Sequence, residues 1–256
     1  AFMNTPDGFT TGANGFATIN PIDAMLNPAT PTKVFHVLSS SYVTVAAILA
    51  TIAAFSLLKK KTDYHKKALK LTVTLTFVFA LLTALAGDFS AKFLADHQPE
   101  KLAAGEWHFE TEENADLILF GWLNEDNEPV GVIRFPGFLS FLAYGDFNSE
   151  VIGLEEFPEA ERPPLWIHYM FDLMVVIGMF LVAVPLLYFI VSKVKRWNEH
   201  NKWMLRLLVT IGPLAMLAVE FGWIYAEEGR QPWILRGFMT VEEAATTSPH
   251  VGLMFF

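Results

Sequence analysis

Four long apolar segments alternate with polar stretches along the chain. A helix needs about 20 apolar residues to cross the hydrocarbon core of a bilayer. Segments of this length lie at roughly 34–58, 68–88, 164–192 and 204–226, and residues 251–256 would begin a fifth helix. The pattern predicts an all-α fold, a polytopic transmembrane helix bundle.

The charges of the connections predict how the bundle is oriented. Basic side chains crowd the first and third connections: Lys59, Lys60, Lys61, Lys66, Lys67 and Lys70, then Lys193, Lys195, Arg196, Lys202 and Arg206. Because cytoplasmic loops are rich in Lys and Arg, both connections should face the cytoplasm. The loop between the second and third helices, residues 91–162, is strongly acidic, with Lys92, Lys101, Arg134 and Arg162 as its basic residues. We expect this loop to be extracytoplasmic.

This orientation divides the chain into six expected parts. Residues 1–33 and 229–250 would be extracytoplasmic segments, 34–90 and 163–228 two pairs of transmembrane helices, 91–162 the extracytoplasmic loop, and 251–256 the start of a truncated helix. The sequence opens with neither an initiator Met nor a signal-peptide pattern. We therefore expect a piece of a longer protein.

Composition narrows the possible chemistry. The chain is 53% hydrophobic and 18% charged, whereas a soluble domain is nearer a quarter charged. It has no cysteine, which excludes disulfides, thiolate metal sites and iron–sulfur clusters within the chain. A redox centre would need His, Met or carboxylate ligands. The acidic loop also argues against nucleic acid as a partner, because phosphate binding requires clustered cations.

Four candidate residues should lie at one depth near the outer interface. Counted outward from the basic anchors at about 1.5 Å per residue, His36, Asp88, Met174 and Glu227 reach a similar level. His and Met on different helices can bind a haem iron from opposite sides. Each also has an ordinary alternative: a His at the membrane interface, or a Met that fills space among apolar neighbours.

The end of the fourth apolar segment combines charge with a helix stop. Glu227 and Glu228 close the segment, Arg230 follows within one turn, and Pro232 ends the helix. A carboxylate near hydrocarbon usually has a partner or a task. Arg230 could pair with Glu227 or with an anionic cofactor group such as a propionate. A capped helix end with interfacial tryptophans would explain the same residues.

The stretch from Gly222 to Trp233 resembles the G-W-x-x-x-E-x-G-R-Q-P-W signature of cytochrome bd ubiquinol or menaquinol oxidase subunit I. Further segments resemble the family in the same order: Lys33–His36 with Ser41–Thr44, Gly87–Asp88, Lys101–Glu106, Val151–Leu154 and Phe171–Val175. The resemblance covers the whole chain but only about the middle half of the family's subunit. The loop lacks the long insertion of some members and so resembles the short quinol-loop type.

The resemblance implies a role for seven residues. His36 and Met174 would be the axial ligands of low-spin haem b, and Glu227 the ligand or near neighbour of high-spin haem b. The others would act beside the cofactors: Trp223 and Arg230 flanking the haems, Lys101 holding the quinol head group, and Glu106 accepting a quinol proton. The main ligand of haem d would lie outside this sequence.

The implied function is that of a terminal oxidase subunit. Electrons would pass from quinol through low-spin haem b to high-spin haem b and haem d, where oxygen is reduced to water. Expected partners are a quinol, a second oxidase subunit, a small single-helix subunit and membrane lipid, in a bacterial or archaeal cell (inner) membrane. Two alternatives stay open: a haem b electron-transfer subunit without oxygen chemistry, and an ion-coupled transporter or scaffold.

One position departs from the family pattern. Some members carry Arg two residues before the methionine ligand, and this sequence has Asp172 there. A propionate contact at that position is therefore not expected.

Overall fold

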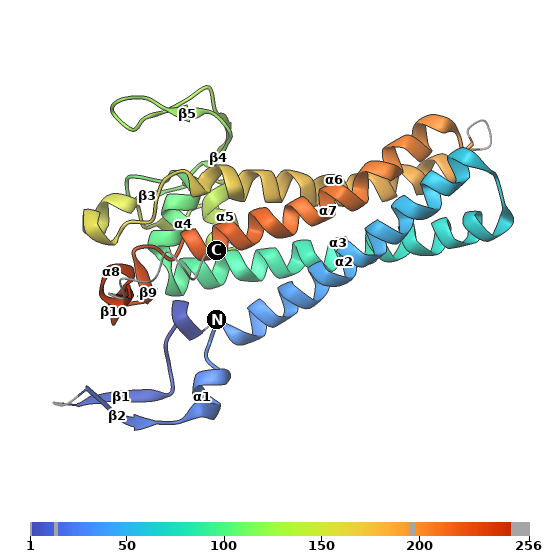
Figure 1. Cartoon of the computed structure of the whole chain (residues 1–256). Helices are drawn as coiled ribbons and strands as arrows, with labels where there is room; N and C mark the ends of the chain where they lie inside the picture. The colour runs from blue at the N-terminus through green and yellow to red at the C-terminus, as the bar shows by residue number, and fades with distance from the viewer. Residues whose placement is uncertain (1, 13–14, 195–197, 247–256) are drawn as a thin grey trace.

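Four long helices form an elongated bundle in the computed structural model, which describes residues 2–12, 15–194 and 198–246 (Figure 1). They are α2 (Thr30–Lys59), α3 (Asp63–His97), α6 (Ile167–Lys193) and α7 (Lys202–Glu228). Each is long and apolar enough to cross a membrane, which confirms the predicted helix bundle. The expected helix start at 251–256 lies outside the described residues.

Helix α3 extends nine residues beyond the predicted end at 88. Neither Gly nor Pro interrupts the chain between Gly87 and Pro99. Lys92 also bonds to Asp88 one turn earlier at 2.6 Å, and such pairs stabilise helices. The connection to α6 therefore begins at residue 98, and the helix projects past its apolar segment.

In the four-helix bundle, α2 lies diagonally opposite α6, and α3 lies diagonally opposite α7. Helix α2 packs against α3 and α7, and α6 packs against the same two helices. Small residues of α2, among them Ala47, Ala50 and Ala54, are buried in one core with Leu208 and Ile211 of α7. The two backbones come close together, since a Cβ on Gly212 would lie 3.1 Å from Ile48 Cα. Helices α2 and α6 consequently lie at opposite corners of the bundle.

A hydrogen bond between helices fixes the depth of α2 against α7. Pro213 lies inside α7 and cannot donate the usual backbone bond to the carbonyl four residues earlier. The Thr51 hydroxyl of α2 donates to the carbonyls of Leu208 and Val209 at 3.2 Å and accepts from Gly212 N at 2.9 Å. Thr51 thus satisfies the carbonyl that Pro213 leaves free.

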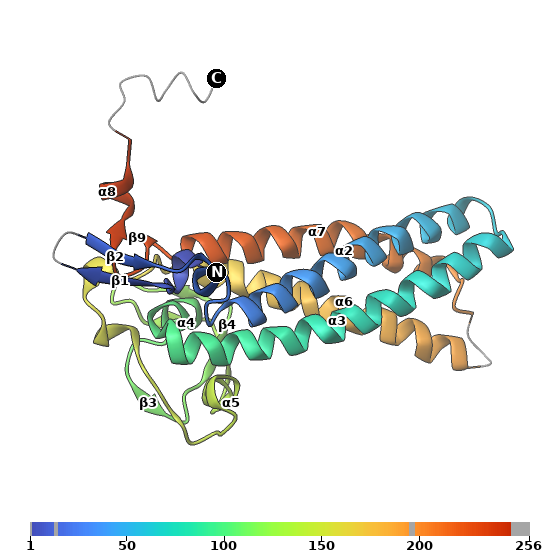
Figure 2. The same ribbon diagram turned by 90° about the horizontal axis from the view of Figure 1, so that it is seen from below.

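The remaining chain gathers at one end of the bundle in short elements (Figures 1 and 2). The helices there are α1 (Pro21–Met25), α4 (Pro99–Glu106), α5 (Phe138–Tyr144) and α8 (Val241–Ala244), with 3₁₀ turns at Phe2–Asn4, Leu154–Glu156 and Glu159–Glu161. Five antiparallel two-stranded ribbons pair β1 (Phe9–Gly12) with β2 (Gly15–Ile19), β3 (Glu112–Glu113) with β8 (Glu150–Val151), β4 (Leu117–Leu119) with β7 (Ile133–Phe135), β5 (Trp122–Leu123) with β6 (Pro129–Val130), and β9 (Trp233–Leu235) with β10 (Met239–Thr240).

This end has a hydrophobic core of its own, separate from that of the bundle. Leu94 of α3, Leu102 of α4, Leu139 of α5, Ile167 of α6 and Tyr225 of α7 meet in it. The acidic segment between α3 and α6 therefore folds as a cap on the helix ends. Because the strands of this segment are only two or three residues long, the alternation that identifies a strand from sequence is too brief to be recognised.

Candidate functional site

Helix α4 carries the two predicted loop residues, Lys101 and Glu106, and it is buried. Its residues from Glu100 to Glu106 are all buried, although the surrounding sequence is strongly charged. Pro99 occupies the first turn, where its missing N–H is no loss. Trp107 ends the helix in the left-handed conformation, with φ 49°. The two charged side chains are therefore held inside the protein rather than in solvent.

Lys101 faces the end of α7. Its Nζ donates to the carbonyl oxygen of Ala226 at 2.9 Å and lies 5.0 Å from the centre of the Tyr225 ring. Gly229 permits this approach, because a Cβ there would lie 2.7 Å from Lys101 Cε. Burial lowers the pKa of Lys101 to about 7, with a further lowering from the nearby charge of Lys33. The side chain is thus close to losing its charge at neutral pH.

Glu106 lies at the other end of α4 and is 2% exposed. Its Oε2 is buried and has no hydrogen-bond partner among the residues that the structure describes. Burial raises the pKa of Glu106 well above its usual value, and the charge of Asp172 raises it further. A carboxyl group in this position favours the protonated form.

Two residues missed by the sequence reasoning, His168 and Asp172, join α6 to this region. Both are fully buried, and His168 Nε2 lies 3.3 Å from Asp172 Oδ2. The His168 Nδ1 lies 2.7 Å from the carbonyl oxygen of Gly105 in α4. Asp172 Oδ2 also accepts a 2.6 Å bond from the backbone N–H of Phe120. Asp172, the acidic residue that departs from the family pattern, thus points toward the cap. In the sequence, the four-residue spacing between His168 and Asp172 was the signal that could have predicted their contact.

The predicted iron ligands His36 and Met174 each face a glycine of a neighbouring helix. A Cβ on Gly87 of α3 would lie 4.0 Å from His36 Cε1, and one on Gly222 of α7 would lie 2.8 Å from the Met174 sulfur. The His36 Nδ1 is buried without a hydrogen-bond partner in the described part of the chain. Both side chains therefore point into the bundle, from helices at opposite corners.

The two side chains lie at similar depths. Thr51 of α2 is level with Val209 of α7, to which it bonds. Fifteen residues separate Thr51 from His36, about 22 Å along a helix. The same distance along α7 from Val209 ends two residues beyond Gly222, the residue that contacts Met174. His36 and Met174 are thus within about one helical turn, roughly 5 Å, in depth.

Asp88, the fourth member of the predicted layer, has a different environment. It is bonded to Lys92 at 2.6 Å, and its side chain is 29% exposed. The neighbouring Gly87 is the residue that faces His36. The structure therefore places Asp88 in a surface ion pair at that depth.

Glu227, Arg230 and Trp223 lie at the end of α7 on a more open side. The Arg230 guanidinium pairs with Glu227 at 2.7 Å; its side chain is 10% exposed and that of Glu227 40%. Within the described ranges, Arg230 Nε is buried without a partner. Trp223, four residues before Glu227 and on the same helix face, is 62% exposed. The structure thus brings Glu227 and Arg230 together and leaves Trp223 uncovered.

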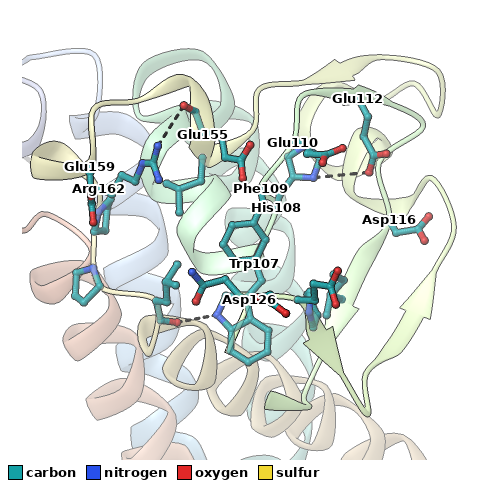
Figure 3. A pocket seen from close by; sticks show the side chains of 18 of the residues that line it. Trp107, His108, Phe109, Glu110, Glu112, Asp116, Asp126, Glu155, Glu159 and Arg162 are labelled. Carbon is teal, nitrogen blue, oxygen red and sulfur yellow. Dashed lines mark hydrogen bonds and ion pairs between the residues drawn. The ribbon is translucent and has the colours of Figure 1, made fainter. Parts of the chain in front are cut away.

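An acidic cavity of about 710 Å³ lies on the cap (Figure 3). The carboxylates of Glu110, Glu112 and Asp116 gather on one side of it, and Glu159 and Arg162 lie on the opposite side. Its inner wall includes Trp107, whose indole Nε1 donates to the carbonyl oxygen of Leu165 at 2.8 Å. The cavity and the buried Glu106 are therefore next to the same residue, Trp107.

Comparison with known proteins decides the family. The family model described as cytochrome bd terminal oxidase subunit I matches residues 1–256, the entire chain. The chain belongs to this family. The resemblance inferred from the sequence is therefore confirmed, and the protein is a multi-pass membrane protein of the cytochrome bd subunit I family.

Individual relatives agree with the family match. A Bacillus subtilis (strain 168) protein provisionally named cytochrome bd menaquinol oxidase subunit I is 37% identical over the whole chain and 59% of its own length. The cytochrome bd ubiquinol oxidase subunit 1 of the same organism is 32% identical over the whole chain and 57% of its length. The solved bd oxidase from Geobacillus thermodenitrificans is 54% identical, with a TM-score of 0.92 over 99% of this chain and 59% of that chain. This chain thus spans less than two thirds of each.

Proposed function

We propose that this chain is the quinol-oxidising, haem-carrying part of a cytochrome bd-type terminal oxidase, a quinol:oxygen oxidoreductase. Electrons would pass from quinol by low-spin haem b to high-spin haem b and haem d, for reduction of oxygen to water. The haems would supply the one-electron chemistry that amino-acid side chains do not provide. The observation that carries the proposal is that His36 and Met174 lie at similar depths and point into the bundle from helices at opposite corners.

His36 and Met174 would hold low-spin haem b through an imidazole nitrogen and a thioether sulfur. Imidazole and thioether are a known donor pair for an electron-transferring haem, in which the thioether raises the potential. The buried, unpartnered ring nitrogen of His36 and the lack of a side chain at Gly222 beside the Met174 sulfur fit this assignment. Both side chains point inward, as ligands of a group inside the bundle must.

Glu227 is the proposed ligand or near neighbour of high-spin haem b. Its carboxylate and the Trp223 indole share an open face of α7, and a carboxylate at this depth is not expected to face lipid. Arg230 carries a free, buried Nε in addition to its bond to Glu227, and it would pair with a propionate. Haem d would take its main ligand from a part of the protein beyond this chain.

Lys101 and Glu106 are the proposed quinol residues. A carboxyl group with a raised pKa is a stronger base once ionised, so Glu106 in its ionised form would accept a proton from a quinol hydroxyl. The Lys101 Nζ would donate a hydrogen bond to a quinol oxygen, from its fixed place beside Tyr225. The acidic cavity beyond Trp107 would receive the released protons.

The loop end of the bundle is proposed to face the outside of a bacterial or archaeal cell membrane. The opposite end carries the lysines of the α2–α3 connection, which favour the cytoplasm. Protons from quinol would then be released outside. The exposed apolar faces of the helices fit lipid, a second oxidase subunit and a small single-helix subunit.

Replacement of His36 tests the proposal in the complete oxidase. His36→Ala should remove the low-spin haem b band from the reduced-minus-oxidised spectrum, because the iron loses one axial ligand. His97→Ala is the matched control: its ring stacks on Phe93 at 4.3 Å at the same end of the bundle, so the band should persist. An unchanged band in His36→Ala would exclude the ligand assignment.

A further inference from the structure

His168 connects the helix that carries Met174 to the helix that carries Glu106. It lies in the first turn of α6, six residues before Met174, and is fully buried. Its Nδ1 lies 2.7 Å from the Gly105 carbonyl oxygen. A carbonyl oxygen can only accept, so Nδ1 carries the hydrogen of this bond. The bond joins α6 to the residue immediately before Glu106.

The imidazole of His168 is held by its Nδ1 bond to Gly105 and by stacking on Trp107. The second ring nitrogen, Nε2, lies 3.3 Å from Asp172 Oδ2 but makes no hydrogen bond to a described residue, and Asp172 itself accepts from the Phe120 backbone N–H. The Trp107 ring stacks on the imidazole, with centroids 3.9 Å apart and planes 21° apart. A side chain fixed in this way can position the group to which it donates.

Glu106 depends on its neighbours for its orientation. Its Oε2 has no hydrogen bond to any described residue. Gly105, before it, is bonded to His168, and Trp107, after it, is stacked on His168 and bonded to the Leu165 carbonyl. The left-handed conformation of Trp107 is uncommon for a large side chain, so this backbone is maintained by the contacts around it.

We propose that His168 is a positioning residue for quinol oxidation, which holds Glu106 at a fixed place relative to the helix of the low-spin haem ligand. The inference rests on the proposed function, since it assigns Glu106 the quinol proton. His168 itself would not contact quinol. It acts through the Gly105 carbonyl and the stacked Trp107.

The test compares two substitutions of His168 in the complete oxidase. In His168→Asn the side-chain amide can still donate to the Gly105 carbonyl, whereas His168→Leu keeps bulk and loses the donor. A displacement of about 1 Å in a catalytic group can cost roughly 100-fold in rate. We expect kcat for quinol oxidation to fall about 100-fold in His168→Leu and within about 3-fold in His168→Asn, with KM and the low-spin haem band little changed. Equal kcat values in the two variants would overturn the proposal.

A double substitution separates positioning from general damage. If His168 acts through Glu106, then adding His168→Leu to Glu106→Gln should lower kcat no further than Glu106→Gln alone. An additional 100-fold loss in the double variant would contradict the proposal. If Glu106→Gln alone retains full activity, the proposed function of Glu106 fails instead.

If the His168→Leu oxidase does not fold or assemble, a substitution of Trp107 provides a second test. Trp107→Phe keeps an aromatic ring over His168 and removes the bond to Leu165. It should lower kcat by about 10-fold with the haem spectrum intact, because one of the three restraints on the backbone around Glu106 is lost and two remain. Wild-type kcat in this variant would overturn the part assigned to Trp107 in holding Glu106.

Discussion

The two groups of site residues at this end of the bundle differ in how fully the chain encloses them. Around α4, Trp107 and Glu106 are each 2% exposed and His168 is fully buried, with partners from α6. On the outer face of α7, Trp223 is 62% exposed and the Glu227 side chain 40%. The chain thus encloses the first group by itself and leaves the second open.

This difference indicates which site residues the chain can position without other parts of the protein. In the enclosed group, residues of α4, α6 and the cap supply the bond of His168 to Gly105, the bond of Asp172 to Phe120 and the stacking of Trp107 on His168. The open group has one internal ion pair, between Glu227 and Arg230. Since the chain covers 59% of the Geobacillus bd oxidase chain that it matches, the open face fits the proposal that haem and further helices cover it.

The same substitution in the two groups gives the largest expected contrast. Trp107→Ala should destabilise the complete subunit by about 3–5 kcal/mol, because it empties a buried, stacked position. Trp223→Ala should lower the free energy of unfolding by less than about 0.5 kcal/mol, because the chain packs little against this ring. It should instead alter the high-spin haem b bands. Thermal melts and difference spectra of both variants would measure this. Equal losses of stability would break the comparison.

The long helices could be predicted from the sequence, while the burial of Lys101 and Glu106 and their contacts with α6 and α7 could not. Apolar length alone locates the four helices. Lys101 and Glu106 occur among many loop carboxylates, and local sequence gives no sign that the Ala226 carbonyl and Asp172 lie beside them. His168 stands in an apolar run after Pro163 and Pro164, and its bond to Gly105 spans 63 positions. Contacts of such separation depend on the tertiary fold.

Replacing Arg236 should weaken the attachment of α4, although Arg236 is not itself part of the enclosed group. This residue follows α7 and β9, and it forms two bonds to Glu100 at the start of α4, at 2.6 Å and 2.8 Å. It also donates to the His97 carbonyl. Arg236→Ala should cost about 2 kcal/mol, since a charged, two-point contact to a mostly buried carboxylate is lost.

The control for Arg236 is Arg134→Ala, at an exposed position of β7 that has no ion pair in the described ranges 2–12, 15–194 and 198–246. It should change stability by less than about 0.5 kcal/mol. Denaturant or thermal unfolding of the complete subunit would measure both. If the two variants lose equal stability, then α4 is not anchored by the segment that follows α7.

Lys101 gives an effect of a different kind, a dependence of stability on pH. Burial lowers the pKa of Lys101 to about 7 in the folded protein, whereas the unfolded chain keeps the ordinary value of 10.5. Between these values the unfolded state binds more protons, so the free energy of unfolding rises with pH, by at most about 1.4 kcal/mol per unit. Below about pH 7 both states are charged and the contribution is flat.

The replacement Lys101→Met should remove that rise, because it fills the same space without a titrating group. Melting temperatures of the complete subunit between pH 7 and 9 should therefore increase less in Lys101→Met than in the wild type. Lys92→Met, at a 40% exposed side chain of α3, loses a charge that solvent reaches, and its pH dependence should follow the wild type. If Lys101→Met keeps the full rise, then Lys101 holds its proton in the folded state, and the enclosed group is more accessible to water than its burial indicates.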